Sequence, residues 1–239
     1  AAKMATLGEM SAGVAHELNQ PLSVLATGGH LLARQTQKGA PPDPALVAQV
    51  AREIEEQVGR ATRIINHLRE FGRKAEVSRS LIDVTEPIAG VFQLLGQQMR
   101  VHDIAVHLDL PAGLPPVWAD KNRMEQVFIN LLLNARDAID ERRQAGDRRG
   151  GEISVAAREE NGQAVVMVRD NGIGIPPALR SRIFEPFFTT KEVGRGTGLG
   201  LSISYGIVRD YGGTITVESC PGQGSCFRVS FPLAAEEAA

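Results

Sequence analysis

A histidine near the start of the chain has the neighbours of an exposed nucleophile. His16 stands in the string GVAHELNQPL, with Glu17 beside it and Asn19 three residues further on. An imidazole with a pKa of about 6.5 is mostly unprotonated at neutral pH, and a carboxylate can hold its other N–H and stabilise the cation formed on attack. At about 100° per helical residue, His16 lies roughly opposite the apolar stripe centred on Val14 and Leu18, so we expect it to point away from the core. Taken alone, it is equally compatible with an ordinary surface histidine.

Two further constellations suit a nucleotide. Asn130 and Asn134 are four residues apart in NLLLNA, so their amides share one helix face, and neutral amide oxygens suit a magnesium ion that arrives on nucleotide phosphates. The string DNGIGIP follows an apolar alternating stretch. Asp170 can accept a hydrogen bond from an adenine amino group there, while Gly172 and Gly174 allow close backbone approach. Two polar surface residues and a simple turn remain the alternatives.

A glycine-rich segment, GRGTGLGLS over 194–202, opens a helix expected from Leu201. Its backbone N–H groups and the positive helix end can receive phosphates. It is not a dinucleotide fingerprint, because no strand precedes it and its spacing differs, and it lacks the Lys-Ser/Thr ending of a P-loop. The apolar string IFEPFFTTK over 183–191 lies between glycine-rich stretches, which predicts a mobile lid with a hydrophobic hinge.

The first 76 residues must position the histidine. Apolar residues recur every three or four positions from Leu7 to Leu32 and from Leu46 to Phe71, and KGAPPDP over 38–44 breaks the pattern. This predicts an antiparallel helical hairpin, with Pro21 bending the first helix one turn past the histidine. Because one hairpin cannot cover both apolar stripes, we expect a homodimer through residues 1–76, with a plain structural coiled coil as the alternative.

The remaining residues mix helices and strands. We expect helices over 85–99 with Thr85 as a cap, over 120–143 with Asp120 as a cap, and over 201–211. A short apolar stretch occupies 80–84. Strands are expected over 104–108, 152–158, 163–169, 214–219 and 225–231, with Asn161-Gly162 as a hairpin turn. Without regular β-α-β alternation, this pattern predicts an α+β sandwich.

Composition excludes several classes of protein. Of 239 residues 43% are hydrophobic and 23% charged, as in soluble globular domains, and a formal charge of −2 offers no case for nucleic acid. No apolar run reaches the roughly 18 residues of a membrane span, so no membrane contact is expected. Two cysteines are too few for a disulfide framework. The chain lacks a signal peptide and begins on a helical pattern, so we expect a cytoplasmic fragment of a longer protein. Whether that protein is anchored in a membrane does not follow.

In this order, HELNQP, NLLLNA, DNGIGIP, IFEPFFTTK and GTGLGLS resemble the H, N, G1, F and G2 boxes of bacterial two-component sensor histidine kinases. The resemblance covers nearly the whole chain, and five boxes in order make chance negligible. It implies a dimerisation and histidine-phosphotransfer domain over 1–76, a linker over 77–82, a catalytic ATP-binding domain over 83–234 and a tail over 235–239. The implied fold is an α-helical hairpin forming a dimeric four-helix bundle, followed by an α+β sandwich of the GHKL or Bergerat type.

The resemblance also implies the chemistry. Mg²⁺-ATP would phosphorylate His16, and the phosphoryl group would pass to an aspartate of a response regulator receiver domain. Glu17 would be the carboxylate partner of His16, and Asn19 would help to set the geometry of the kinase reaction. Gln20, one turn after the histidine, would orient water to dephosphorylate the regulator, although a merely solvated Gln20 is equally compatible. Asn134 would bind magnesium with help from Asn130. The implied nucleotide contacts are Asn130, Asn134, Asp170, Gly172, Gly174, Ile175, Lys191, Arg195, Gly196, Thr197, Gly198, Leu199, Gly200 and Ser225.

Two positions depart from the family's pattern. Asp137 stands where many relatives carry a phosphate-contacting lysine, so that contact is absent or moves to Arg136, Lys191 or Arg195. Ser225 stands where relatives usually have a threonine near the adenine aspartate.

Two other functions agree less well with these residues. ATP hydrolases of the same superfamily, such as gyrase or MutL-type clamps, place a glutamate one turn before the magnesium asparagine, where this chain has Asn130, which cannot act as a base. A non-catalytic dimeric scaffold is disfavoured because each box contains a chemically competent residue. The signal, the identity of the regulator and phosphorylation in cis or in trans do not follow from the sequence.

Overall fold

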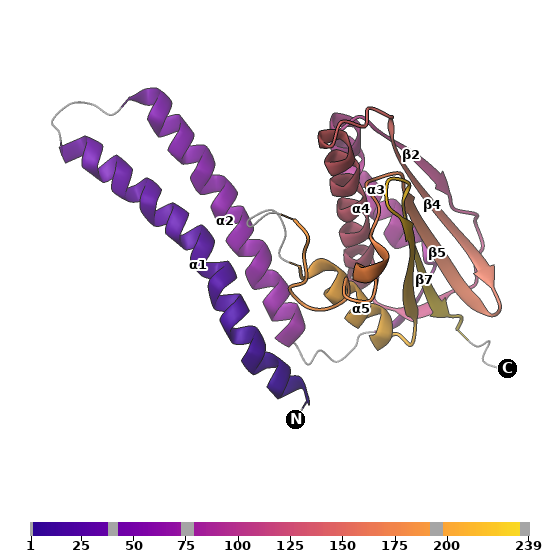
Figure 1. Ribbon diagram of the computed structural model, residues 1–239. Coiled ribbons are helices and arrows are strands. Elements are labelled where there is room, and N and C mark those ends of the chain that lie inside the picture. The colour runs from indigo at the N-terminus through magenta and orange to yellow at the C-terminus, as the bar shows by residue number, and fades with distance from the viewer. Residues whose placement is uncertain (1, 38–42, 73–78, 192–197, 235–239) are drawn as a thin grey trace. The chain divides into compact units, whose positions relative to one another are not determined.

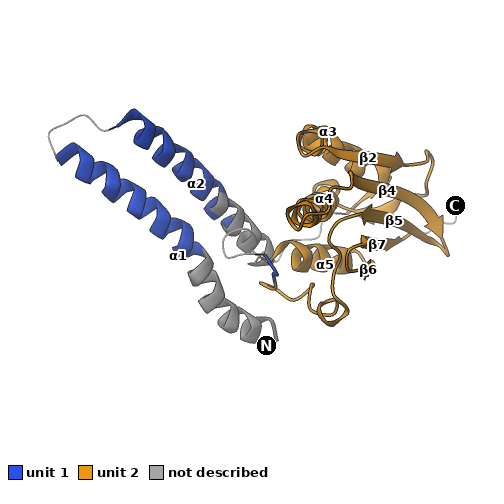
Figure 2. Ribbon diagram, turned by 45° about the horizontal axis from the view of Figure 1, so that its top comes forward, with its two compact units in different colours: residues 1–73, 189–197 blue, residues 74–188, 198–239 orange. Residues whose placement is uncertain are grey.

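The computed structural model describes residues 2–37, 43–72, 79–191 and 198–234, and the side chains of the first helix from Leu18 onward. The chain divides into two compact units, drawn in different colours in Figure 2. Residues 1–73 with 189–197 form one unit, built around a helical hairpin. Residues 74–188 with 198–239 form the other, in which helices pack on a sheet.

The hairpin consists of α1 (Ala2–Gln37) and α2 (Pro44–Gly72), as the apolar spacing predicts (Figure 1). Asp43 directly precedes α2 and caps its first turn, since its carboxylate accepts the N–H of Ala45 at 3.0 Å. Gly28 lets the helices approach closely, since a Cβ there would lie 3.1 Å from Val50 Cγ1. Helix α1 continues through Pro21, which is buried, and the bend expected there stays a prediction.

The second unit contains a sheet of five strands in the order β2-β4-β5-β7-β6. Strand β2 runs parallel to β4, and the other neighbours are antiparallel. Strands β1 and β3 form a separate two-stranded sheet. The strands are β1 (Ser80–Ile82), β2 (Ile104–Asp109), β3 (Val117–Ala119), β4 (Gly151–Glu160), β5 (Gln163–Asp170), β6 (Thr214–Cys220) and β7 (Gly224–Pro232). The strands expected from the sequence correspond to β2, β4, β5, β6 and β7. The sequence marked β1 only as a short apolar stretch and did not mark β3, and each of these two strands has only three residues.

Helices α3 (Thr85–Val101), α4 (Lys121–Gln144) and α5 (Gly200–Asp210) lie along one face of this sheet (Figure 2). The core between them and the strands contains the largest fully buried side chains, which are Phe128, Phe231, Ile88, Met99, Met124, Leu131, Leu132, Ile139, Ile153, Leu199 and Ile207. This arrangement confirms the expected α+β sandwich.

The two predicted helix caps differ in outcome. Asp120 caps α4 as expected, with Oδ1 accepting the N–H of Arg123 at 3.0 Å. The prediction that Thr85 caps α3 is wrong. Asp83 instead accepts both the N–H and the hydroxyl of Thr85, each at 2.8 Å, because a carboxylate two residues earlier forms an Asx turn.

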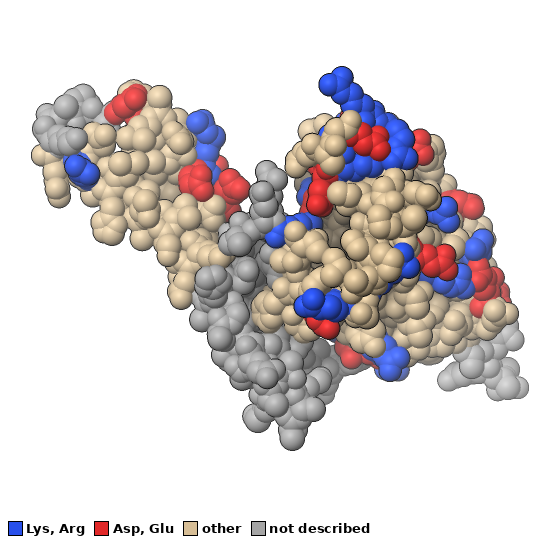
Figure 3. Space-filling model, viewed as in Figure 1, with Lys and Arg blue, Asp and Glu red and all other residues tan. Residues whose placement is uncertain are grey.

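Charges of both signs are interspersed on the face of the second unit seen in Figure 3. The ion pairs of this unit include Arg149 with Asp147 and Arg182 with Glu185. No helix in the described ranges is both long enough and apolar enough to cross a membrane.

Candidate functional site

One stripe of helix α4 connects the predicted nucleotide-binding segments. Asn130, Asn134 and Ala138 are spaced by four residues and therefore lie on one helix face. At its first end, Asn130 Nδ2 donates to Gly200 O at 3.0 Å and to Ser204 Oγ at 3.1 Å, which fastens the start of α5. At the other end, Ala138 O accepts the N–H of Ile173 at 3.0 Å, within the loop that follows β5.

Asn134 lies midway along this stripe and is partly exposed. Its side chain makes no hydrogen bond to any residue in the described part of the chain, whereas the amide nitrogen of Asn130 is bound to α5. A ligand held between the loop after β5 and the start of α5 would therefore lie against Asn134. The two asparagines thus occupy different environments, which their shared helix face does not predict.

Asp170 ends β5 and is buried, with 5% of its surface exposed. Its Oδ1 accepts the N–H of Gly172 at 2.8 Å, and the N–H of Ser225, its cross-strand partner on β7, also donates to the carboxylate. Burial raises the pKa of the Asp170 carboxyl to about 6, while these two hydrogen bonds act in the opposite direction. An isolated buried carboxylate at a strand end suits a ligand that brings its own hydrogen-bond donor.

The loop after Asp170 is packed too tightly for side chains at its glycines. A Cβ at Gly172 would lie 2.6 Å from Ala138 Cβ. Gly174 has a φ of +74°, and a Cβ there would lie 2.2 Å from Cys220 O. The glycines therefore let α4 and the β6–β7 turn hold the loop on both sides, in addition to any role toward a ligand.

Asn171 has a structural role in this loop. Its Oδ1 accepts the N–H of Glu152 at 3.0 Å, and its Nδ2 donates to Gly150 O at 2.9 Å. The side chain therefore fastens the loop to the start of β4.

The lid segment and the glycine-rich segment meet through their backbones. A Cβ at Gly198 would lie 2.3 Å from the carbonyl carbon of Phe187, and both residues have positive φ. Leu199, at 2% exposure, is buried in the core just before α5. No side chain caps α5 in the described part of the chain, so its first N–H groups can receive an anion.

Some predicted residues cannot be placed in the site. Arg195, Gly196 and Thr197 lie outside the described residues. Lys191 is described, and its N–H donates to Thr189 Oγ1 at 3.1 Å. Arg136, the other candidate for the absent lysine, donates from Nε and Nη2 to Asp137 Oδ1 at 3.0 and 2.7 Å. Asp137 therefore holds this guanidinium beside its own helix.

The hairpin carries the predicted phosphoacceptor cluster on α1. His16 and Glu17 belong to this helix, but their side chains lie outside the described residues. The outward direction of His16 thus stays a prediction. Asn19 is exposed, and its carbonyl accepts the hydroxyl of Ser23 at 2.8 Å. Gln20 is partly buried.

Two residues that contact the loop after β5 have no counterpart among the sequence motifs. Ser219 on β6 accepts the N–H of Ile175 at 2.7 Å, and Arg180 donates to Ser219 O. No spacing in the sequence marks these residues, because β6 reaches the loop only through sheet pairing. Ala138 could have been identified, since it continues the four-residue spacing of the asparagines.

Two family models match the chain. Residues 6–76 match the His kinase A (phospho-acceptor) domain, and residues 119–235 match the histidine kinase-, DNA gyrase B- and HSP90-like ATPase domain. The two-component sensor PprA of Pseudomonas aeruginosa is 42% identical over 98% of this chain and 25% of its own length. The chain spans a quarter to about half of the curated relatives that it matches.

Solved structures agree with these matches. The catalytic domain of the histidine kinase ThkA has a TM-score of 0.55 at 33% identity, covering 65% of this chain and 95% of that domain. ThkA in complex with the response regulator TrrA has a TM-score of 0.75 at 29% identity, covering 98% of this chain and 64% of that one. Full-length ShkA with AMPPNP has a TM-score of 0.68 at 25% identity, covering 96% of this chain and 47% of ShkA.

Proposed function

The chain belongs to the two-component sensor histidine kinases, and on this basis we propose that it is a kinase catalytic core that phosphorylates His16 with ATP. The phosphoryl group then passes to an aspartate in the receiver domain of a response regulator. Histidine phosphotransfer is assigned to residues 1–76, the linker to 77–82, ATP binding to 83–234 and the tail to 235–239. The structure of ShkA with AMPPNP supports ATP as the nucleotide, and that of ThkA with TrrA supports a response regulator as the partner protein.

The α4 stripe is the observation that carries this proposal. It fastens the loop after β5 at Ala138 and the start of α5 at Asn130, with Asn134 between them. The adenine amino group would donate to Asp170, and the phosphates would lie toward the first N–H groups of α5. The hydrolase alternative is disfavoured, since the amide nitrogen of Asn130 binds α5 and an amide cannot activate water as a base.

Magnesium suits the donor set at this site. Asn134 offers a neutral amide oxygen, a ligand that Mg²⁺ accepts when phosphates supply most of the others. Asn134 would hold the ion, which when bound would neutralise phosphate charge during transfer.

The chemistry requires little covalent help from the protein. A ring nitrogen of His16 attacks the γ-phosphorus, the bond to the β-γ bridging oxygen breaks, and ADP leaves. Glu17 holds the other ring N–H and stabilises the charged phosphoimidazole. Transfer onward forms a bond from an aspartate oxygen of the receiver to the same phosphorus and releases neutral histidine.

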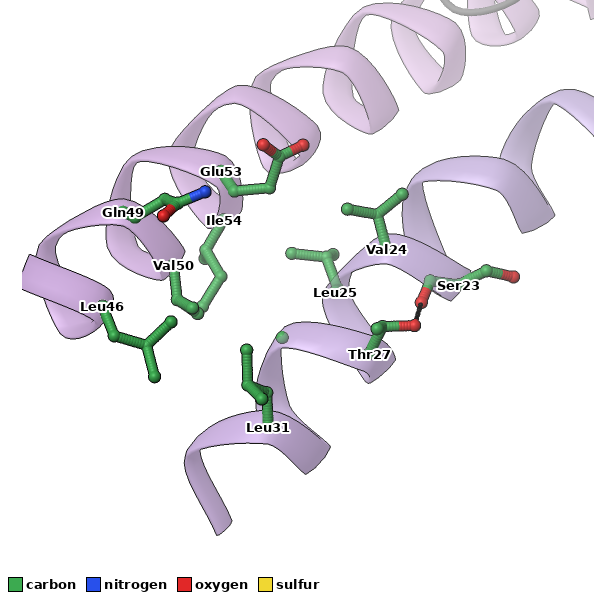
Figure 4. A pocket seen from close by; sticks show the side chains of 11 residues that line it. Ser23, Val24, Leu25, Thr27, Leu31, Leu46, Gln49, Val50, Glu53 and Ile54 are labelled. Carbon is green, nitrogen blue, oxygen red and sulfur yellow. Dashed lines mark hydrogen bonds between the residues drawn. The ribbon is translucent and has the colours of Figure 1, made fainter. Parts of the chain in front are cut away.

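A second copy of the chain would cover the apolar side chains that a single hairpin leaves exposed. Large apolar side chains remain exposed along it, namely Leu22, Val24, Leu31, Val47, Val58 and Ile65. An apolar groove of about 330 Å³ lies between α1 and α2, lined by residues including Leu25, Leu31 and Leu46 (Figure 4). Burying this surface in a four-helix bundle would stabilise a homodimer.

Gln20 is proposed to support dephosphorylation of the regulator by orienting water. Gln20→Ala is expected to slow loss of phosphate from purified phosphoregulator while autophosphorylation continues. If both activities fall together, or neither changes, this role is excluded.

The proposed kinase activity is tested by incubating the chain with radiolabelled ATP. We expect incorporated phosphate that is labile in acid and stable in alkali, as phosphohistidine is. His16→Gln should abolish incorporation while ADP affinity stays unchanged, because the substitution removes only the nucleophile. Phosphate on the His16→Gln chain, or an acid-stable product, would contradict the assignment.

A further inference from the structure

Ser219 on β6 holds three polar groups at the nucleotide-binding loop. Its Oγ accepts the N–H of Ile175 at 2.7 Å, donates to Gly224 O at 2.9 Å and lies 3.0 Å from Ser225 Oγ. Ser225 is buried directly opposite Asp170 in the β5–β7 pair, so both side chains lie on the same face of the sheet. Ser219 thus connects the loop to the residue beside the proposed adenine carboxylate.

All three contacts can form together in only one arrangement of the hydroxyl protons. A serine hydroxyl has one proton to donate and two lone pairs to accept. Gly224 O can only accept, so the Ser219 proton points to it, and the N–H of Ile175 occupies one lone pair of Ser219. The contact with Ser225 therefore requires that Ser225 donate its proton to Ser219.

This arrangement determines what Ser225 presents to a ligand. With its proton directed to Ser219, the Ser225 oxygen offers only lone pairs beside the Asp170 carboxylate. Two neighbouring acceptors match an amino group, which has two hydrogens to donate. The same two acceptors disfavour a carbonyl oxygen at that position, because a carbonyl oxygen has no hydrogen to donate.

We infer that Ser219 is a specificity-determining positioning residue, which makes the site select a 6-amino over a 6-oxo purine by directing the proton of Ser225. The inference rests on the proposed function, since it requires that the site bind a purine nucleotide. It adds a residue outside the glycine-rich and asparagine motifs to the machinery that recognises the base.

The test compares ADP with inosine diphosphate, which carries an oxygen in place of the amino group, by isothermal titration. Ser219→Ala frees the Ser225 proton to turn toward the ligand, so the preference for ADP over inosine diphosphate should fall by about tenfold, the equivalent of one hydrogen bond. Ser219→Thr keeps the hydroxyl and should restore the preference. The matched control is Ser230→Ala, which removes a buried hydroxyl bound at 2.7 Å to Thr214 Oγ1 between the same two strands, and it should leave the preference unchanged.

A double substitution tests whether Ser219 acts through Ser225. In a Ser225→Ala background, Ser219→Ala should cause no further change in the preference, because no proton remains to be directed. The inference would be overturned if Ser219→Ala caused the same tenfold loss of preference in the Ser225→Ala background, or if the single Ser219→Ala variant kept its preference for ADP. In either case, ADP binding by the unsubstituted chain would still support the proposed function. Failure of the unsubstituted chain to bind ADP would overturn both.

Discussion

At the scale of single residues, Asp170 combines its proposed role in binding adenine with a cost in stability. A buried carboxylate whose pKa rises to about 6 is ionised at pH 8, and no cationic side chain among the described residues is in hydrogen-bond contact with it. Two backbone N–H groups compensate only part of the desolvation, and a ligand amino group would supply the missing donor. Residues of this kind are expected where binding is favoured over folding stability.

Asp170→Asn should therefore change binding and stability in opposite directions. ADP affinity should fall by about 1.5–3 kcal/mol, the typical value of a hydrogen bond to a charged group. The free energy of unfolding at pH 8 should rise by about 1–2 kcal/mol, because the ionised form of Asp170 is disfavoured by burial. Titration calorimetry and urea unfolding measure the two quantities, and equal ADP affinity in a folded variant would mean that the loop is only a turn.

The same pKa predicts the pH dependence. Because the folded-state pKa of Asp170 is raised, its favourable contribution to stability is complete below the unfolded value of 3.8 and is lost as pH rises through about 6. The stability difference between Asp170→Asn and the unsubstituted chain should thus narrow from pH 8 to pH 4. ADP affinity should decline below about pH 6, as the carboxylate that accepts the amino group becomes protonated. The Asp170→Asn variant corrects for titration of the ADP phosphates.

At the scale of elements, helix α4 carries one asparagine that is bound to α5 and one that is proposed to face the ligand. Asn130 makes two hydrogen bonds to α5, whereas Asn134 makes none within the described ranges. Asn130→Ala should lower the free energy of unfolding by about 1–2 kcal/mol, since the carbonyl of Gly200 and the hydroxyl of Ser204 lose a donor. Asn134→Ala should leave stability nearly unchanged and remove the gain in ADP affinity that magnesium provides.

Each of these variants is the control for the other, since they make the same substitution on the same helix face. Urea unfolding and calorimetry with and without magnesium measure both effects. A magnesium-dependent loss confined to Asn130→Ala would reverse the two assignments.

At the scale of the whole molecule, the hairpin leaves large apolar side chains exposed, whereas the second unit has its own core. Val24 and Leu31, two of the exposed apolar side chains of α1, line the groove between α1 and α2 (Figure 4). Helices α3, α4 and α5 instead bury their apolar faces in the core beside the sheet. Association is therefore expected to depend on the hairpin.

Leu31→Glu tests this expectation, because Leu31 lines the groove and is already 40% exposed in a single hairpin. A charge there should weaken the dimer by at least about tenfold, the effect of losing more than 1.4 kcal/mol. Sedimentation equilibrium of the full chain measures this dissociation. Leu94→Glu places the same charge on α3, where Leu94 is 66% exposed, and should leave the dimer intact. Equal weakening by both variants would contradict an interface at the groove.

Much of the architecture could be predicted from local patterns. Apolar spacing of three and four marks α1 and α2, alternation marks the long strands, and Asp120 marks the start of α4. These features depend on residues within one turn or one strand, so the chain determines them without reference to its distant parts. The strand β3 escaped prediction because three residues are too few to show a period, and it is ordered by pairing with β1 across the intervening residues 83–116.

The candidate site also combines features that the sequence shows with features that only the tertiary structure shows. The sequence by itself determined which residue types could bind a nucleotide, since Asp170, Asn134 and the glycines are chemically recognisable at their spacing. Only the tertiary structure decided that Asn130 binds α5 and that Ser219 reaches Ser225. The physical reason is that hydrogen-bond partners and proton directions depend on contacts between elements far apart in the chain. A pattern of residues within one element does not contain those contacts.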